Sequence, residues 1–475
     1  MNYEWNYEAP SAEEKEQGRI LGREVGVHPV LGQLLVHRGI TSAAEARRFF
    51  RPQLSELADP FLMDDMHTAV DRLNEAMGRK ERIMVYGDYD VDGCTAVALV
   101  YRFLRQFYSN VDFYIPDRYD EGYGVSRKGV DHAAEMGVGL VIVLDCGIKA
   151  VDEIAYARSL GIDFIICDHH VPDKTMPPAV AVLNPKRADN HYPCTDLSGC
   201  GVGFKFMQAF AESNGIELNK LTPLLDLCAV SIAADIVPIT GENRILAYHG
   251  LRCLNTAPSV GLSAIVETCG LGERELTMAD IIFKIGPRIN ASGRMQNGSE
   301  AVELLVEKDY DAALERAARI NLYNEARKDL DKQITEEATE RVRQLPDLDA
   351  RRAIVLTGDT WHKGVIGIVA SRLVEKTGRP VIVVSVDEHG EGKGSGRSVQ
   401  GFNLHTCIAS CEDILLRFGG HAMAAGLSVR EENLHELRRR LNEWAARECP
   451  VLLTPPLECD LSIHLDRITV ESVRR

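Results

Sequence analysis

The sequence predicts an α/β protein with a doubly wound, mostly parallel sheet, joined by a long helix to a smaller α/β domain. From residue 81 short apolar runs alternate with helical segments, a pattern typical of buried parallel strands separated by helices. A charged segment over residues 309–344 keeps a helical period without glycine or proline. Two later apolar runs, RRAIVLTGD and RPVIVVSV, begin a second α/β pattern.

These patterns divide the 475 residues into five parts. A helical segment over residues 1–80 is expected to pack on the domain that follows it. Residues 81–300 form the larger α/β domain, 301–345 the connecting helix and 346–450 the smaller domain. Residues 451–475 look like the opening of another unit that is not completed within this sequence. The strands expected in the larger domain are RIMVYG, VDFYIP, LVIVLD, DFIICD and AVAVLN, with a helix over Cys94–Phe107 after the first.

The composition is that of a soluble globular protein, with 45% hydrophobic and 26% charged residues. No apolar run reaches the roughly 18 residues of a membrane span, and the acidic N-terminus has no signal-peptide pattern, so a cytoplasmic protein is expected. The twelve cysteines stand singly without a CxxC pair, which favours buried thiols over disulfides or a zinc site. The net charge of −16 does not exclude nucleic acid, because residues 350–450 carry slightly more basic than acidic side chains.

Three aspartates, Asp88, Asp90 and Asp92, directly follow the strand RIMVYG. Their spacing also begins a calcium-binding EF-hand loop, which requires a preceding helix and a glutamate at position 12. Position 12 is Leu99 and a strand precedes the loop, so this alternative is excluded. Ligands of open parallel sheets bind at the carboxyl ends of the strands, where these aspartates are expected.

Two more strands end in acids or imidazoles. Asp145 follows LVIVL, and Asp168, His169 and His170 follow DFIIC. Carboxylates with one or two imidazoles suit Mn²⁺ or Mg²⁺, and two such ions ~3.5–4 Å apart can share a carboxylate. Asp235, after a helical stretch, fits as a further ligand. The sequence therefore predicts a two-metal site at this edge of the sheet.

The run Asp168-His169-His170 resembles the signature of the DHH phosphoesterases, and GDYDVDG, VLDCG and AADIVP stand in the order of that family's other motifs. The resemblance implies that Asp145 bridges both ions and that His170 is catalytic, contacting the scissile phosphate or the leaving group. Many relatives have a histidine where this chain has Tyr86, and Asp88 or water would replace that ligand. The implied metal ligands are Asp88, Asp90, Asp92, Asp145, His169 and Asp235.

The second half resembles the nucleic-acid-binding domain that accompanies DHH domains, on the segments GKGSGRS and FGGHAMAAG. Their glycines would let backbone amides approach phosphates closely. FKIGPRINASGRM resembles the RecJ branch of the family. For any one arginine, a solvated surface charge is the alternative explanation. The implied phosphate-binding residues are Arg118, Arg288, Asn290, Arg294, Ser395, Arg397 and His421.

The resemblance implies a metal-dependent 5′-to-3′ exonuclease that hydrolyses single-stranded DNA to 5′-mononucleotides in DNA recombination and repair. Expected partners are single-stranded DNA, a single-strand-binding protein and a helicase, with no membrane association and a monomeric state. Members of the RecJ branch usually continue into an oligonucleotide-binding barrel, which is not encoded here. The sequence is therefore expected to be either truncated or a shortened member.

Three other functions are alternatives. A phosphodiesterase for short oligoribonucleotides or dinucleotides would lack the N-terminal segment and the connecting helix. A catalytically silent replication scaffold would not need an intact set of ligands. A pyrophosphatase shares the metal chemistry without the FKIGPRINASGRM and GGHAMAAG segments.

Overall fold

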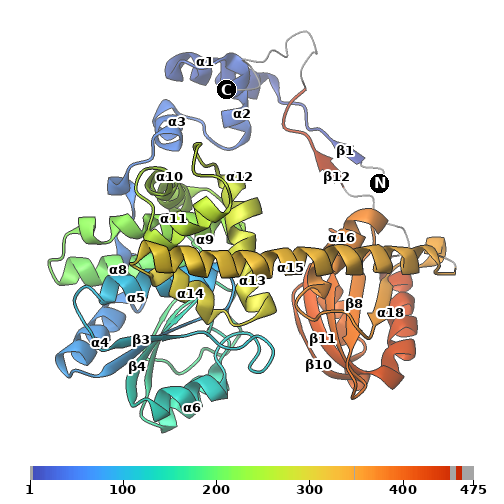
Figure 1. Cartoon of the computed structure of the whole chain (residues 1–475). Helices are drawn as coiled ribbons and strands as arrows, with labels where there is room; N and C mark the ends of the chain where they lie inside the picture. Colours follow the sequence, from blue (N-terminus) through green and yellow to red (C-terminus); the bar gives the residue numbers. More distant parts are fainter. Residues whose placement is uncertain (1–3, 347, 450–455, 463–475) are drawn as a thin grey trace. The chain divides into compact units, whose positions relative to one another are not determined.

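The computed structural model describes residues 4–346, 348–449 and 456–462. The chain forms two compact units, a larger one of Arg51–Ala326 and a second one of Met1–Phe50 with Arg327–Arg475. The long helix α15 (Tyr310–Arg343) crosses the boundary and matches the helix expected over residues 309–344 (Figure 1). Within the described residues, no helix has the length and apolar character that crossing a membrane requires.

The larger unit is built on a five-stranded, all-parallel sheet in the order β3-β2-β4-β5-β6. This order confirms the predicted doubly wound fold. Gly87, Leu144 and Cys167 align across the three central strands, so the residue after each strand reaches the same edge of the sheet. The strands are β2 (Arg82–Gly87), β3 (Val111–Tyr114), β4 (Val138–Leu144), β5 (Asp163–Cys167) and β6 (Ala181–Leu183).

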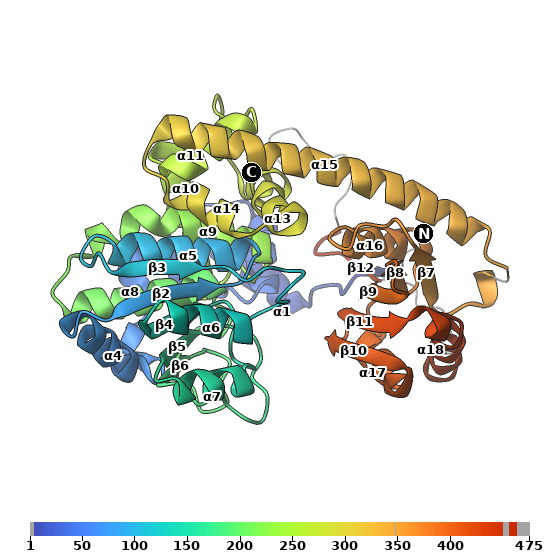
Figure 2. The same ribbon diagram turned by 60° about the horizontal axis from the view of Figure 1, so that its bottom comes forward.

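Helices cover both faces of this sheet, which is why its strands are apolar at nearly every position. Leu140 and Ile142 of β4 pack in the core with α4, α5 and α8, whereas Val141 and Val143 pack against α6 and α7 (Figure 2). The helices here are α4 (Met66–Gly78), α5 (Val91–Leu104), α6 (Arg127–Glu135), α7 (Val151–Ser159) and α8 (Gly199–Ser213).

Helix α5 begins three residues before the expected start at Cys94, because the Asp90 side chain caps it by accepting a hydrogen bond from Gly93 N (3.1 Å). The helices that complete the larger unit are α9 (Leu225–Asp235), α10 (Gly241–Thr256), α11 (Val260–Thr268), α12 (Met278–Asp280), η5 (Ile281–Ile285), α13 (Gly286–Met295) and α14 (Ser299–Val306), with the short turns η1 (Leu54–Glu56), η2 (Pro60–Leu62), η3 (Leu218–Lys220) and η4 (Thr222–Leu224).

The second unit has a sheet in the order β10-β11-β9-β8-β7, in which only the pair β7–β8 is parallel among the described strands. Most of the glycine-rich segment GKGSGRS lies in the central strand β9, and its glycines make room for neighbours: a methyl at Gly394 would lie 2.9 Å from Leu427 Cδ1. The elements are β7 (Ile354–Gly358), α16 (Ile366–Thr377), β8 (Val381–Val386), β9 (Glu391–Arg397), α17 (Leu404–Ala409), β10 (Leu415–Gly420), β11 (Ala424–Arg430) and α18 (Leu434–Glu448), with η6 (Leu348–Ala350), η7 (Glu412–Ile414) and η8 (Glu431–Asn433).

The structure divides the expected N-terminal segment 1–80 at Phe50. Residues from Arg51 onward belong to the larger unit because buried Lys205 donates to Ala58 O (2.7 Å) and Glu242 accepts from Ala58 N (2.9 Å). The earlier part forms β1 (Glu4–Asn6), α1 (Ala12–Val25), α2 (Pro29–His37) and α3 (Ala43–Phe50). Of the expected unit at 451–475, β12 (Pro456–Glu458) pairs with β1, and residues 451–455 and 463–475 lie outside the described residues.

Candidate metal centre

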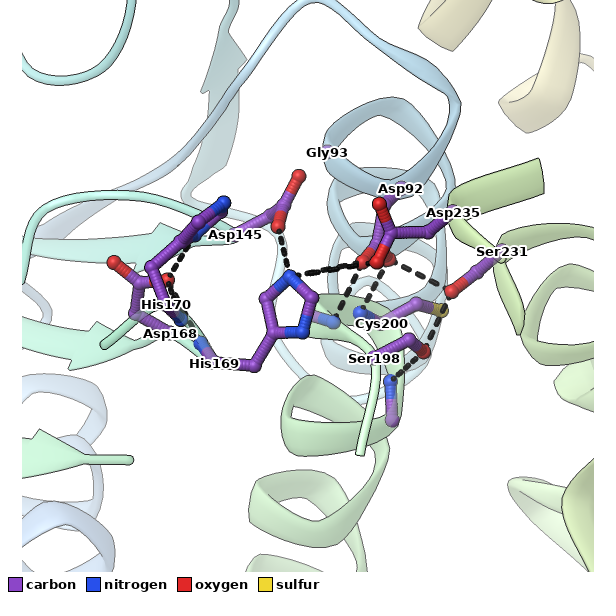
Figure 3. Close-up of polar contacts among 12 residues, drawn as sticks. Asp92, Gly93, Asp145, Asp168, His169, His170, Ser198, Cys200, Ser231 and Asp235 are labelled. Carbon is purple, nitrogen blue, oxygen red and sulfur yellow. Dashed lines mark hydrogen bonds and ion pairs between the residues drawn. The ribbon is translucent and has the colours of Figure 1, made fainter. Parts of the chain in front are cut away.

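The carboxyl ends of β2, β4 and β5 bring the predicted ligands together. Asp88, Asp145 and Asp168 are the first residues after these aligned strands, and all three are buried. Figure 3 shows the side chains of Asp92, Asp145, His169 and Asp235 directed toward one another.

His169 lies at the middle of the cluster. Its Nε2 atom is 3.1 Å from Asp145 Oδ1, 3.6 Å from Asp235 Oδ2 and 3.7 Å from Asp92 Oδ2. Two groups of potential ligand atoms, each within 4.8 Å of one another, share this histidine: one with Asp145 and His170, the other with Asp92 and Asp235. The geometry therefore provides two adjacent positions for a cation.

The electrostatics of the cluster favour a bound cation. Burial, followed by the charges of Asp92 and Asp90, raises the pKa of Asp145 well above its usual range and that of Asp235 to about 8. Asp88 Oδ1, Asp145 Oδ1 and both ring nitrogens of His169 are buried without a hydrogen-bond partner among the residues that the structure describes. Buried polar atoms in this state are rare, and divalent cations would satisfy them. The residues present fit Mn²⁺ or Mg²⁺.

Asp92 is fixed by three donors from other parts of the unit. Its carboxylate accepts from Gly199 N (2.6 Å) and Cys200 N (2.7 Å) at the start of α8, and from the Ser231 hydroxyl (2.7 Å) on α9. These contacts leave the carboxylate little freedom, because hydrogen bonds to a metal ligand fix its orientation.

Asp145 has a left-handed backbone with φ of 60°. Non-glycine residues rarely adopt this conformation, and such strain is concentrated at functional sites. The conformation is compatible with α8 only because residue 199 is glycine: an added Cβ there would lie 2.6 Å from Asp145 Cβ and 2.7 Å from Asp145 Oδ1. Gly199 is thus a site residue that sequence reasoning missed.

Asp168 holds His170 rather than facing the cluster. Its buried carboxylate accepts from Ile148 N (2.9 Å) and His169 N (2.7 Å), and Oδ1 is 2.8 Å from His170 Nδ1. Burial lowers the pKa of His170, but the hydrogen bond to Asp168 and that group's charge outweigh it, so the pKa is raised. The His170 side chain remains 37% exposed, so a substrate can reach it.

Two tyrosines, Tyr123 and Tyr86, lie near the cluster of predicted metal ligands. The Tyr123 hydroxyl donates to Asp145 O (3.1 Å) and lies 3.3 Å from His170 Nε2, and no sequence signal marked this residue. Tyr86 donates to Gly124 O (2.9 Å) within the core facing α6 and α7. The Tyr86 side chain is therefore part of the hydrophobic core. It does not supply the metal ligand that the family resemblance would place at this position.

The phosphate-binding candidates of the larger unit lie in different surroundings. The Arg118 guanidinium stacks over the Tyr89 ring at 4.8 Å, next to Asp88 in sequence, and Arg294 O accepts from Tyr119 on the same loop as Arg118. Arg288 is held by Asn321 Oδ1 (2.9 Å) and Lys284 O (2.8 Å). The remaining candidate, Asn290, is half-buried on α13.

The three candidates of the second unit lie close together. Arg397 Nη1 donates to Ser395 Oγ (3.1 Å), and both side chains lie against Gly367 in the first turn of α16. Arg397 pairs with Ala424 across β9 and β11, which brings it next to the hairpin turn that carries exposed His421. A helix N-terminus beside an arginine and a serine is well suited to bind an anion.

Comparisons with known proteins agree with this fold and site. Residues 82–232 match the DHH family, N-terminal domain, and residues 351–447 match the DHHA1 domain. The single-stranded-DNA-specific exonuclease RecJ of Bacillus subtilis is 39% identical over 471 residues, covering 99% of this chain and 58% of the relative. RecJ of Haemophilus influenzae is 36% identical, covering 90% of this chain and 76% of the relative, and RecJ of Escherichia coli is 34% identical, covering 87% and 74%.

Solved structures give the same result. RecJ of Thermus thermophilus in complex with Mn²⁺ superposes with a TM-score of 0.82 at 30% identity, over 96% of this chain and 64% of that chain. An exonuclease RecJ bound to manganese superposes with a TM-score of 0.73 at 33% identity, over 83% and 97%.

The fold and the site define a DHH-domain protein whose second unit contains a DHHA1 domain. At this level of identity and coverage the family is also settled. The chain belongs to the RecJ family, as the sequence predicted. It spans 58% of the length of the Bacillus subtilis relative and 64% of the Thermus thermophilus structure.

Proposed function

We propose that this chain is a metal-dependent 5′-to-3′ exonuclease that hydrolyses single-stranded DNA to 5′-mononucleotides, in DNA recombination and repair. The observation that carries the proposal is the imidazole of His169, surrounded at 3.1–3.7 Å by carboxylates of Asp145, Asp235 and Asp92. The names of relatives that are 34–39% identical over most of this chain support the same activity and substrate.

The residue roles follow from the two groups of ligand atoms. Two divalent cations bound there, Mn²⁺ or Mg²⁺, would activate water and neutralise charge on the scissile phosphate. The two groups share His169, with Asp145 in one group and Asp92 and Asp235 in the other. We assign Asp145, which carries an unpartnered buried oxygen, to both positions because the family resemblance implies that role. Asp90, the cap of α5, and Asp88 complete the set.

His170 is assigned to the phosphate. Its ring is the exposed member of the cluster, and Asp168 fixes the ring through Nδ1, which leaves Nε2 to face the substrate. With its pKa raised by Asp168, the imidazole can hold a proton and donate a hydrogen bond to a phosphate oxygen or to the leaving group. Tyr123 would limit the rotation of this ring.

End recognition is assigned to the second unit. Ser395 and Arg397 would hold the terminal 5′-phosphate with the first turn of α16, while Arg118 and Arg294 contact the backbone near the metals. A single-strand-binding protein and a helicase are proposed as partners of a monomeric enzyme. None of the twelve cysteines, all of which lie among the described residues, forms a disulfide, which supports activity in a reducing compartment, the cytoplasm.

Digestion of single-stranded DNA labelled at either the 5′ or the 3′ end, with Mn²⁺, tests the proposal. Early time points should release labelled mononucleotide from the 5′ label and a descending ladder from the 3′ label. Duplex DNA and short oligoribonucleotides should be cleaved far more slowly, and EDTA should stop the reaction. Preferred cleavage of the oligoribonucleotides would instead indicate a phosphodiesterase for short RNA, and no cleavage of any substrate would indicate a silent scaffold.

A further inference from the structure

A cavity of about 540 Å³ opens at the C-terminal end of α5 on the larger unit. We call it the α5 pocket and define it by Tyr101, Arg102, Arg105, Lys220 and Lys308. Helix α5 carries Asp90 at its other end, twelve residues before Arg102, which corresponds to about 18 Å at 1.5 Å per residue. The α5 pocket is therefore separate from the candidate metal centre.

The charge of this cavity is unusual for the chain. Four cations line it, Arg102, Arg105, Lys220 and Lys308, and no acidic residue does. The whole sequence contains more acidic than basic residues, 70 against 54. A cavity lined by basic residues alone therefore differs from the charge balance of the chain. Across the described residues none of the four cations forms an ion pair, so their charge is available to a ligand.

Arg102 is the only one of the four cations that is half-buried; Arg105, Lys220 and Lys308 are exposed. The Arg102 guanidinium makes one hydrogen bond within the described part of the molecule, from Nη1 to Leu305 O (3.5 Å). Burial lowers the pKa of Arg102, although the negative charge of Asp226 acts in the opposite direction. The Asp226 carboxylate accepts hydrogen bonds from Ser259 N and Leu227 N and none from the arginine among the described residues. Since a guanidinium has five N–H donors, most of those of Arg102 remain for an anion.

The rest of the wall suits an aromatic base. The half-buried ring of Tyr101 packs edge-on against Phe113, and the Arg105 guanidinium lies over it, 5.9 Å from the ring centroid. Apolar side chains of Leu224 and Val306 continue the surface, with the amide of Asn219 beside them. The volume lies within the ~300–1,000 Å³ of small-molecule sites, far more than a bare phosphate fills. Aromatic and apolar surface beside several cations is the combination that binds nucleotides.

We propose that the α5 pocket binds a nucleoside phosphate, with its phosphates on Arg102, Arg105, Lys220 and Lys308 and its base against Tyr101. The ligand is either a free nucleotide or one nucleotide unit of a strand, which share this chemistry. The proposal goes beyond the nuclease activity and does not depend on it, because the pocket shares no residue with the candidate metal centre.

Calorimetric titration of the whole chain with ADP, inorganic pyrophosphate, adenosine and a thymidine pentanucleotide, in EDTA to suppress binding at the metal centre, tests this. ADP should bind one-to-one, pyrophosphate should compete and adenosine alone should not. Arg102→Gln and Lys220→Gln should each raise the Kd for ADP about tenfold, the loss of a charge-assisted hydrogen bond. Tyr101→Leu should weaken ADP but not pyrophosphate. If ADP binds more tightly than the pentanucleotide, the ligand of the α5 pocket is a free nucleotide. If the pentanucleotide binds more tightly, the ligand is one nucleotide unit of a strand.

Lys15→Gln is the matched control, because Lys15 is an exposed lysine on α1 outside the pocket. It should leave the Kd unchanged. Arg105 and Lys308 are both exposed, so their double change to Gln keeps the test valid if Arg102→Gln does not fold. Absence of ADP binding up to about 1 mM would overturn the proposal, as would equal weakening by the pocket variants and by Lys15→Gln.

Discussion

Replacing Gly199 by alanine should disable the site without unfolding the protein. The new Cβ would lie 2.6 Å from Asp145 Cβ and 2.9 Å from Asp145 Cα. Asp145 cannot easily retreat, because its N–H donates to Cys167 O (2.9 Å) and its carbonyl accepts from Tyr123 (3.1 Å). The carboxylate and the start of α8 must therefore move apart.

The size of the effect follows from these distances. Carbon atoms in ordinary contact are about 3.5–4.0 Å apart, so the side chain must shift by about 1 Å. A displacement of that size at a reacting centre costs about 10²-fold in rate, and disturbing the groups that orient metal ligands costs about 10–100-fold in metal affinity. Overpacking costs about 1–3 kcal/mol of stability, which a domain of this size tolerates.

The assay is kcat/KM on single-stranded DNA with Mn²⁺, together with Mn²⁺ calorimetry and thermal unfolding. Gly201→Ala is the matched control on the same helix, since its Cβ would meet Leu197 Cδ2 and Ser198 Oγ at 3.4 Å. Activities of the two variants within about threefold of each other, a difference below 1 kcal/mol, would refute the packing argument.

Four further outcomes are expected. Asp145→Ala should lower kcat by at least ~10³-fold with the fold retained, and more than a tenth of the wild-type rate at saturating Mn²⁺ would contradict its assignment to both metals. His169→Ala should weaken Mn²⁺ binding whereas His170→Ala should chiefly lower kcat, and calorimetry giving the opposite pattern would exchange their roles. Asp168→Asn should lower kcat with little change in the Kd for Mn²⁺; a parallel loss of metal affinity would make it a ligand. Arg397→Ala should lose about 1.5–3 kcal/mol on 5′-phosphorylated strands and much less on 5′-hydroxyl strands, and equal losses would make it a general contact.

The sheet and the acids at its edge could be predicted because both depend on local sequence. Runs such as LVIVL of β4 are apolar at every position, since helices cover both faces, and this marks a buried parallel strand. Parallel strands end at a common edge, so Asp88, Asp145 and Asp168 could be expected to lie together before any coordinate was known. The sequence did not predict that GKGSGRS forms a strand. Its glycines make room for Val384, Leu404 and Leu427, which belong to other strands and helices, so the reason for the glycines lies in tertiary packing.

The two α/β units, the long helix and the ligand types of the site could be predicted from the sequence, because apolar periodicity and ligand type are properties of consecutive residues. The family could be predicted from the resemblance of its motifs. The folded structure was needed to show that Asp168 orients His170 and that Gly199 makes room for Asp145. It was also needed to show that Tyr123 contacts both Asp145 and His170. These contacts join residues from different elements. Their geometry is set by how α8 and the loop after β3 pack at the edge of the sheet, which no local pattern specifies.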